Sequence, residues 1–245
     1  MPTPRDRARA QTMTDILEIG RRHLAADGAA ALSLRAVARD LGVVSSAVYR
    51  YVRSRDELLT MLLIDGYTAL GDAVDAALAA EPGDPVHGLR ALGRTLRGWA
   101  LAEPARYGLL FGTPVPGYHA PAEQTVQSGT RLILAMMRLL AAAHAAGALT
   151  EPPGVPAASP ALHADFEAIR TEFGLPLPDW LAARGTALYA GLIGAVSADV
   201  FDMYGAQTFA DRAELFEYQL DGLLAMVGAQ PVRRAAPAPR PLTAP

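Results

Sequence analysis

The chain of 245 residues contains no cysteine. This absence excludes disulfide bonds, zinc sites built from thiolates and a cysteine nucleophile. The chain also lacks an unbroken apolar run of the length that a membrane span needs. Its N-terminus, residues 1–7, lacks the apolar segment of a signal peptide. We therefore expect a cytoplasmic protein with no membrane partner.

Aromatic residues are few, at 7% of the chain, although 51% of the residues are hydrophobic and alanine is used heavily. Alanine is the best helix former, and the β-branched residues that favour strands are comparatively sparse. This composition predicts an all-α fold. All 22 basic residues are arginine, and nothing functional follows from the missing lysines.

The chain also lacks the common catalytic motifs. It has no glycine-rich phosphate loop, nucleophile elbow or H-E-x-x-H sequence. Among the five histidines, His163 has an acid at metal-ligand spacing on a predicted helix, Glu167, and such a pair more often lies on a solvated helix face. We predict no catalytic residue, metal or cofactor, and expect that the protein is not an enzyme.

Charge is distributed unevenly along the chain, although the formal net charge is only -3. Residues 1–55 hold ten arginines and five acids, a net charge of +5. Residues 56–230 hold nine arginines and twenty acids, a net charge of -11. A basic segment joined to an acidic body is typical of a nucleic-acid-binding region attached to a domain with another task.

Proline divides the chain, because it removes a helix donor and clashes with the preceding turn. Long proline-free stretches cover residues 5–81, 122–151 and 179–230. The predicted helices are 8–26, 85–102, 122–148, 179–205 and 208–228. From Pro231 onward, proline, alanine and arginine without apolar periodicity predict a disordered tail. The expected domains are 1–57, 58–230 and the tail, 231–245.

Two short helices around a glycine turn are predicted within the basic segment. Ser33 precedes residues 34–41 as an N-cap, Gly42 can adopt positive φ, and a second short helix spans 45–52. A long helix follows from residue 54 or 55. The apolar side chains expected to pack between the short helices are Val37, Ala38, Leu41, Val43 and Val48. This pattern fits a helix-turn-helix, whose second helix enters the major groove, although an ordinary helical hairpin has the same spacing.

Residues 32–58, LSLRAVARDLGVVSSAVYRYVRSRDEL, resemble the signature of the tetracycline-repressor (TetR) family. That signature reads approximately L-[ST]-x-R-x-[VIL]-A-x-x-L-G-V-[ST]-x-x-[AT]-[LV]-Y-x-[HY]-[FV]-x-[SN]-[KR]-x-x-L. The resemblance implies a three-helix DNA-binding domain followed by a helical domain for ligand binding and dimerisation. Val44 departs from the pattern, because the family usually has a capping serine or threonine there. Ser45 could take over the cap one residue later.

The resemblance also implies which residues contact double-stranded DNA. These are Ser33, Arg35, Ser45, Ser46, Tyr49, Arg50, Tyr51 and Arg55. Tyr49, Tyr51 and Arg55 are expected on the DNA backbone, and Ser33 and Arg35 on phosphate or a base edge. The two serines of the second helix and its arginine are expected to read bases, since a guanidinium can bond guanine O6 and N7 together. The same arginine could also be a solvated surface residue.

The body is expected to bind a small apolar effector. Residues 99–114 resemble a stretch of one branch of TetR-like C-terminal domains, in which a short helix links the ligand pocket to the DNA-binding region. The residues expected to line the pocket are Trp99, Tyr107, Phe111, Met136, Met137, Leu140, Phe166 and Tyr189. Core packing is the alternative for each of them, but aromatic rings with adaptable methionines together favour an apolar site.

A homodimer is expected through the helices near 179–205 and 208–228, because the family builds its interface from its last two long helices. The first of them carries several small residues: Gly185, Gly191, Gly194, Ala195 and Ala198. The alternative is that both apolar stripes face only the protomer's own core. Asp199 and Asp202 could meet a cationic ligand or a partner arginine, but we favour an exposed helix face for them.

The sequence therefore predicts a DNA-binding transcriptional regulator. More specifically, it predicts a repressor that a small apolar effector releases from a palindromic operator. The alternative is a helical module that binds partners or ligands without operator specificity.

Overall fold

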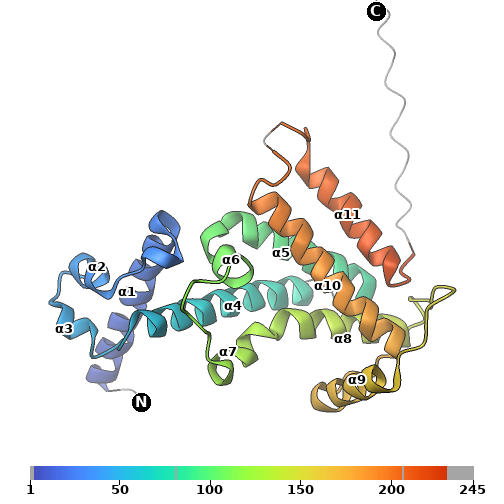
Figure 1. Cartoon of the computed structure of the whole chain (residues 1–245), viewed down its shortest axis with the longest axis horizontal. Helices are drawn as coiled ribbons and strands as arrows, with labels where there is room; N and C mark the ends of the chain where they lie inside the picture. The colour runs from blue at the N-terminus through green and yellow to red at the C-terminus, as the bar shows by residue number, and fades with distance from the viewer. Residues whose placement is uncertain (1–2, 81, 206, 231–245) are drawn as a thin grey trace, which may run out of the picture.

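The computed structural model describes residues 3–80, 82–205 and 207–230. A small head, made by the first three helices, lies at one end of a larger helical body (Figure 1). The helices of the head are α1 (Pro4–Asp27), α2 (Leu34–Asp40) and α3 (Ser45–Val48), with a 3-10 turn at Ala29–Ala31. The helix α4 (Arg55–Ala80) runs from the head into the body.

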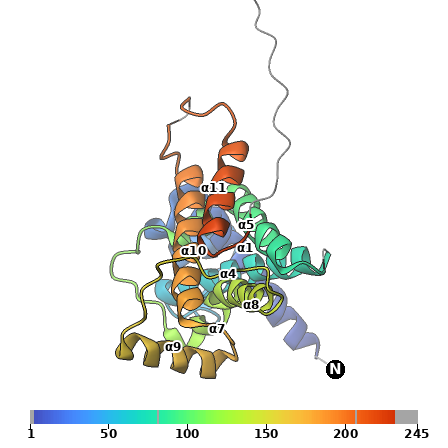
Figure 2. The same cartoon turned by 90° about the vertical axis from the view of Figure 1, so that its right-hand side faces the viewer.

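The body consists of seven further helices among the described residues. They are α5 (Pro85–Ala102), α6 (Pro104–Phe111), α7 (Ala122–Gly129), α8 (Arg131–Ala145), α9 (Pro160–Phe173), α10 (Asp179–Val200) and α11 (Arg212–Met226). The last two lie side by side in both views (Figures 1 and 2). The predicted all-α fold is confirmed, and the predicted tail lies outside the described residues.

Local capping explains where several helices begin. α1 starts at Pro4, earlier than predicted, because Thr3 and Asp6 form a capping box: the Asp6 amide donates to Thr3 Oγ1 at 3.2 Å, and the Thr3 amide donates to Asp6 Oδ2 at 2.9 Å. The carboxylate of Asp84 accepts from the Val86 amide at the start of α5. Proline occupies the first position of both helices, where a missing N–H costs nothing.

Three predicted helices of the body have wrong boundaries. The stretch 122–148 is two helices, α7 and α8, that meet at Thr130. The Thr130 hydroxyl donates to the Val126 carbonyl at 2.7 Å, a side-chain bond that competes with regular helix geometry. The stretch 179–205 ends as a helix at Val200, because Asp202 adopts a positive φ of 53°. The helix predicted over 208–228 begins only at Arg212, where the Asp211 side chain caps it.

Two hydrophobic cores share the helix α4. Leu58, Leu59 and Leu62 belong to the core of the head, and Leu70 and Val74 belong to the core of the body. Three residues of the body also pack against the core of the head: Leu109, Val115 and Tyr118. Since a regular helix is stiff over this length, α4 transmits the position of one core to the other.

The helix α10 is long and apolar enough by composition to cross a membrane, a property that core helices share. One of its faces is buried, and the buried side chains of that face include Leu181, Leu188, Leu192 and Val196. Asp199 is also buried, with only 8% of the residue exposed. Its carboxylate lies 2.7 Å from Arg97 and 3.6 Å from Arg212. The expectation of an exposed face was therefore wrong for Asp199.

Asp202, by contrast, lies at the surface and pairs with the same Arg212. A buried carboxylate with a charged hydrogen-bond partner contributes more to stability than an exposed ion pair does. We expect Asp199→Asn to lower the free energy of unfolding by about 2 kcal/mol, because it leaves Arg97 without its charged partner. Asp202→Asn, in which asparagine tolerates the positive φ, should cost less than about 1 kcal/mol. Urea unfolding measures both, and equal losses would contradict this assignment.

Candidate nucleic-acid interface

The turn between α2 and α3 has the geometry that a helix-turn-helix needs. Gly42 adopts a φ of 73°, which glycine reaches without steric cost. Its amide donates to the Arg39 carbonyl at 3.1 Å, and the amide of Val43 donates to the Ala38 carbonyl at 3.0 Å. These bonds close α2 and direct the chain into α3 three residues later.

Small apolar side chains hold the two short helices together. Val37, Ala38 and Val48 are buried as predicted, and Leu41 packs against them. The prediction for Val43 was wrong, because 41% of this residue is exposed. α3 itself ends at Val48, and the expected helical residues up to Val52 form a turn. Val52 is nevertheless fully buried in the same core, which anchors this turn.

Four of the eight residues predicted to contact DNA are exposed on this unit. They are Arg35, Ser46, Tyr49 and Arg50. Ser33 and Ser45 are half-buried; Ser33 occupies the N-cap of α2, but its side chain makes no capping hydrogen bond. These six side chains lie on or next to α2 and α3, and their contact with DNA stays a prediction.

The other two predicted DNA contacts, Tyr51 and Arg55, bind within the protein. The guanidinium of Arg9 lies over the Tyr51 ring, 5.3 Å from its centre. Arg55 donates to the carbonyls of Ala29 and Ala30 at 3.0 and 3.1 Å. Arg55 thus joins the start of α4 to the turn after α1. No sequence pattern signals these two bonds, because the acceptors are backbone carbonyls, and the contact of Arg55 with a phosphate stays a prediction.

A histidine–aspartate pair holds α1 against the end of α2. His23 Nε2 lies 2.7 Å from Asp40 Oδ2. The hydrogen bond from His23 lowers the pKa of the Asp40 carboxyl below its ordinary value. Both residues were unremarkable in the sequence, since they stand 17 positions apart without a motif.

A second polar contact joins the head to the body at Asp65 of α4. The buried Arg106 of α6 donates to the Asp65 carboxylate at 2.7 Å and to its carbonyl at 3.0 Å. Arg21 of α1 lies 3.5 Å from the same carboxylate. The Arg106 guanidinium also lies 5.6 Å from the centre of the Trp99 ring. One carboxylate therefore connects α1, α4 and α6.

The residues predicted to line an effector pocket occupy several different places in the body. Tyr107, Met136 and Leu140 are fully buried in the core of the body. The Tyr107 hydroxyl donates to the Ile193 carbonyl at 3.0 Å, and its ring lies 5.1 Å from that of Phe111. Close packing in this cluster leaves these side chains in contact with protein.

Tyr189 lies near the same aromatic cluster. Burial, together with the nearby phenols of Tyr67 and Tyr107, raises the pKa of Tyr189 to about 12. Trp99 lies apart from the ring cluster, beneath Arg106.

Met137 and Phe166 do line a cavity together. It measures about 40 Å³ and lies between α8, α9 and α10, with Leu175 and Leu177 in its wall. Phe166 also faces an open hollow of about 420 Å³ that Trp180 lines. Phe166 thus separates a small apolar cavity from the surface.

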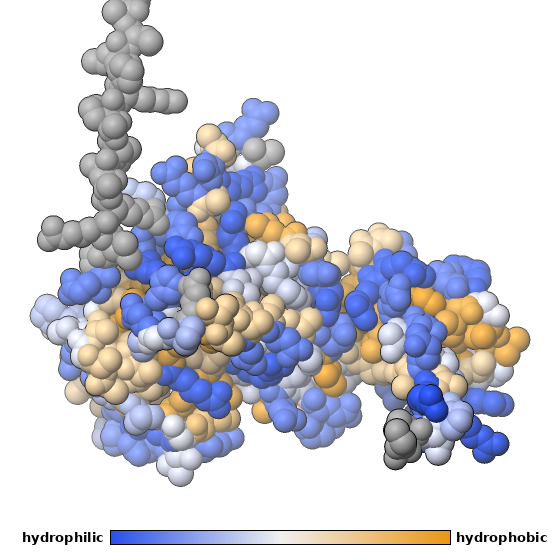
Figure 3. Space-filling model, turned by 180° about the vertical axis from the view of Figure 1, so that it is seen from behind, coloured by the Kyte–Doolittle hydropathy of each residue, from blue (hydrophilic) through white to orange (hydrophobic). Residues whose placement is uncertain are grey.

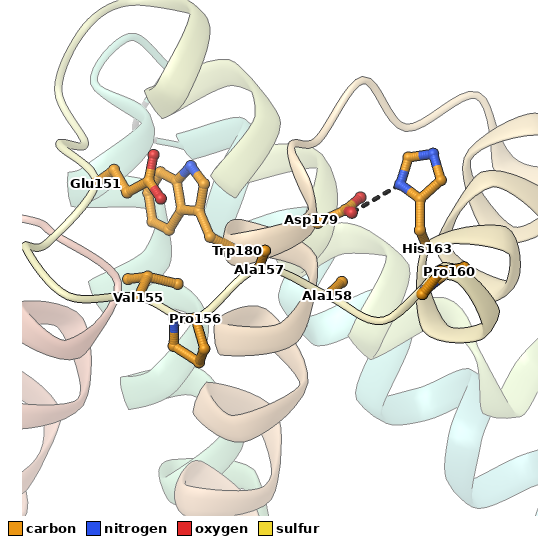
Figure 4. A pocket seen from close by; sticks show the side chains of 9 residues that line it. All are labelled: Glu151, Val155, Pro156, Ala157, Ala158, Pro160, His163, Asp179 and Trp180. Carbon is orange, nitrogen blue, oxygen red and sulfur yellow. Dashed lines mark hydrogen bonds and ion pairs between the residues drawn. The ribbon is translucent and has the colours of Figure 1, made fainter.

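A second hollow, of about 650 Å³, lies next to the hollow of about 420 Å³ (Figure 4). Trp180 and the segment 155–158 line both hollows. At one end of it His163 and Asp179 point toward one another, with 2.7 Å between Nδ1 and Oδ2. Glu167, the acid at metal-ligand spacing, pairs instead with Arg170 at 2.6 Å. Within the described residues, no group of three or more potential ligands could hold a metal ion.

A helix-turn-helix head on a helical body defines a class of DNA-binding transcriptional regulators, and sequence comparisons give the family. Residues 16–62 match the model of bacterial regulatory proteins of the tetR family, and residues 89–223 match the tetracyclin repressor-like C-terminal domain. The chain belongs to the TetR family of transcriptional regulators.

Sequence similarity to known relatives extends over nearly the whole chain. The HTH-type transcriptional regulators Rv1816 of Mycobacterium tuberculosis and Mb1846 of Mycobacterium bovis are each 47% identical over 221 residues, which cover 90% of this chain and 94% of theirs. The crystal structure of the regulatory protein SCO4313 is 34% identical, with a TM-score of 0.74, and the match covers 91% of this chain and 100% of that one. The two mycobacterial relatives are thus HTH-type transcriptional regulators.

The contributions of Arg55 and Arg50 to the free energy of unfolding can be compared without DNA. Arg55→Ala removes two hydrogen bonds from a charged donor and should lower the free energy of unfolding by about 1.5–3 kcal/mol. Arg50 is exposed, so that Arg50→Ala should change it by less than about 0.5 kcal/mol. Thermal and urea unfolding of the two variants test this. A fully stable Arg55→Ala variant would show that these two bonds contribute nothing to the stability of the fold.

Proposed function

We propose that this regulator is a repressor that binds a palindromic operator as a homodimer in the cytoplasm and that a small apolar effector releases it. The observation that carries the proposal is an uncovered apolar face on α10, which stands beside α11 and far from the exposed recognition helix. A dimer through this face presents two heads to one DNA duplex. Two recognition helices are needed because one alone buries too little surface to discriminate well among sequences.

The uncovered face of α10 consists of small residues at helical spacing. Its exposed positions are Ala183, Ala187, Ala190 and Gly194, with the exposed Thr186 at its edge. On α11, Tyr218 is 68% exposed, and Gly222 and Ala225 follow it at intervals of four and three residues. A solvated face normally carries charged side chains, and small residues let another helix approach closely. These two rows therefore support an interface with a second copy.

Two glycines of α10 have another role, within the protomer. A Cβ added at Gly185 would lie 2.8 Å from Met137 Sδ, and one at Gly191 would lie 2.5 Å from a Leu223 methyl group. They permit α8 and α11 to pack closely on α10. Gly194, the third glycine of α10, faces open space, because a Cβ there meets no atom within 4 Å.

The effector is proposed to enter the body beneath α9. The 40 Å³ cavity is lined almost wholly by apolar atoms, and displacement of Phe166 would join it to the hollow beside Trp180. Apolar space that is poorly filled favours an apolar ligand over water. Arg184 also lines this hollow, and its guanidinium donates to the Met226 carbonyl at the end of α11. A ligand there would act directly on the pair of helices proposed to form the dimer.

The route from effector to DNA is proposed to pass through α6. Tyr107 of α6 is bonded to α10 through the Ile193 carbonyl and lies 2.8 Å from Ser197 Oγ. Arg106, the preceding residue, is bonded to Asp65, whose carboxylate forms an ion pair with Arg21 of the head at 3.5 Å. A shift of α10 would therefore displace the head. The effector must bind the displaced form more tightly, since equal affinity for both forms shifts nothing.

The test of the proposal is selection from a random-sequence double-stranded DNA library at near-physiological salt. We expect enrichment of a palindrome with half-site centres about 34–36 Å apart, since the two heads must reach successive major grooves. Arg50→Ala should relax the preference at one position in each half-site. Compounds that release the selected DNA would then identify the effector. Binding without sequence preference would favour the alternative, a helical ligand- or partner-binding module.

The dimer face is tested by Gly194→Arg. An arginine there fits the isolated protomer but blocks close approach of a second α10, so we expect a folded monomer that binds the selected DNA at least tenfold more weakly. Gly98 of α5 is a matched control, because a Cβ at this position also meets nothing within 4 Å. Gly98→Arg should remain dimeric. Light scattering after size-exclusion chromatography gives the mass, and a dimeric Gly194→Arg variant would place the interface elsewhere.

A further inference from the structure

Val44 is a large apolar side chain that the folded protein leaves in water. It is 72% exposed and occupies the N-cap of α3, with extended backbone angles of φ -68° and ψ 145°. Hydrophobic residues also reach the surface at the outer end of the head in the space-filling view (Figure 3). Single exposed valines are common, so exposure alone does not indicate a function for Val44. Its position directly before α3 is what points to one.

Neither capping nor packing accounts for Val44. A serine or threonine at an N-cap accepts a hydrogen bond from an amide of the first helical turn, whereas valine has no acceptor. No side chain caps α3 in its place. The residue is also absent from the hydrophobic core of the head. Folding alone therefore gives no reason for a valine at this position.

The start of a recognition helix is the part that meets base edges in the major groove. Among the groups that bases present there, the C5-methyl of thymine is the apolar one. Val44 lies directly before α3 and offers two methyl groups to such a partner. Ser46 and Arg50, which are exposed farther along, supply polar groups instead.

We propose that Val44 packs against the methyl group of a thymine in each half-site of the operator, and thereby selects thymine over cytosine at that position. The inference rests on the proposed sequence-specific binding of DNA and assigns one base to one residue. Val43 is the natural comparison, because it has the same side chain but is only 41% exposed, with its backbone amide bonded to Ala38.

The experiment uses the full chain and the DNA sequence selected from the library. Each thymine is replaced in turn by deoxyuridine, which lacks only the methyl group. We expect the unmodified protein to lose affinity about 3- to 10-fold at one thymine in each half-site, the effect of one buried methyl contact. Val44→Ala should bind the thymine and deoxyuridine operators equally. Val44→Thr keeps one methyl group and should retain part of the discrimination.

Val43→Ala is the matched control and should discriminate thymine from deoxyuridine as the unmodified protein does. Thermal unfolding of Val44→Ala should be unchanged, because the side chain is exposed. The inference is overturned if Val44→Ala still binds the thymine operator more tightly than the deoxyuridine operator, or if it loses affinity for both by the same factor. It is also overturned if no thymine in the selected half-site lowers the affinity when deoxyuridine replaces it. Selection of no sequence at all would instead overturn the proposed function, and the inference with it.

Discussion

The carboxylate of Asp65 is the contact on which the arrangement of head and body depends. It lies near the middle of α4, binds the buried Arg106 of α6 at 2.7 Å and lies 3.5 Å from Arg21 of α1. The two hydrophobic cores lie on either side of it along the same helix. Because the Arg106 side chain is nearly buried and needs its charged partner, α6 cannot separate from α4 without a loss of stability. The angle of the head is thus tied to the position of α6.

This constraint explains how a signal in the body could reach DNA without a hinge. α6 is bonded to α10 on one side, through Tyr107, and to α4 on the other, through Arg106. Packed helices of this kind respond to a shift by moving together, since interiors are close to their maximum density. The proposed effector would enter beneath α9, where a small cavity is open, because the ring cluster around Tyr107 is already filled by protein.

The helix-turn-helix could be predicted because its signals are local: a glycine that permits positive φ, a cap position and a run of small apolar residues. Helix boundaries were less accessible, since the ends of α7 and α10 depend on a side-chain bond at Thr130 and on the backbone of Asp202. The proposed effector site was the hardest part to predict. Aromatic residues and methionines signal burial equally well whether they line a cavity or fill one, as Tyr107 and Phe166 illustrate.

The amino-acid sequence by itself determined the all-α class, the family and the location of the recognition helix, because these follow from short-range spacing and from residue types within a few turns. Only the tertiary structure decided the partners of Arg55, Asp199 and Arg106, each of which binds atoms far away along the chain. It also decided that Val43 and Val44 remain exposed. Such contacts depend on how helices cross, and no periodicity within one helix specifies the side chains that another helix presents to it.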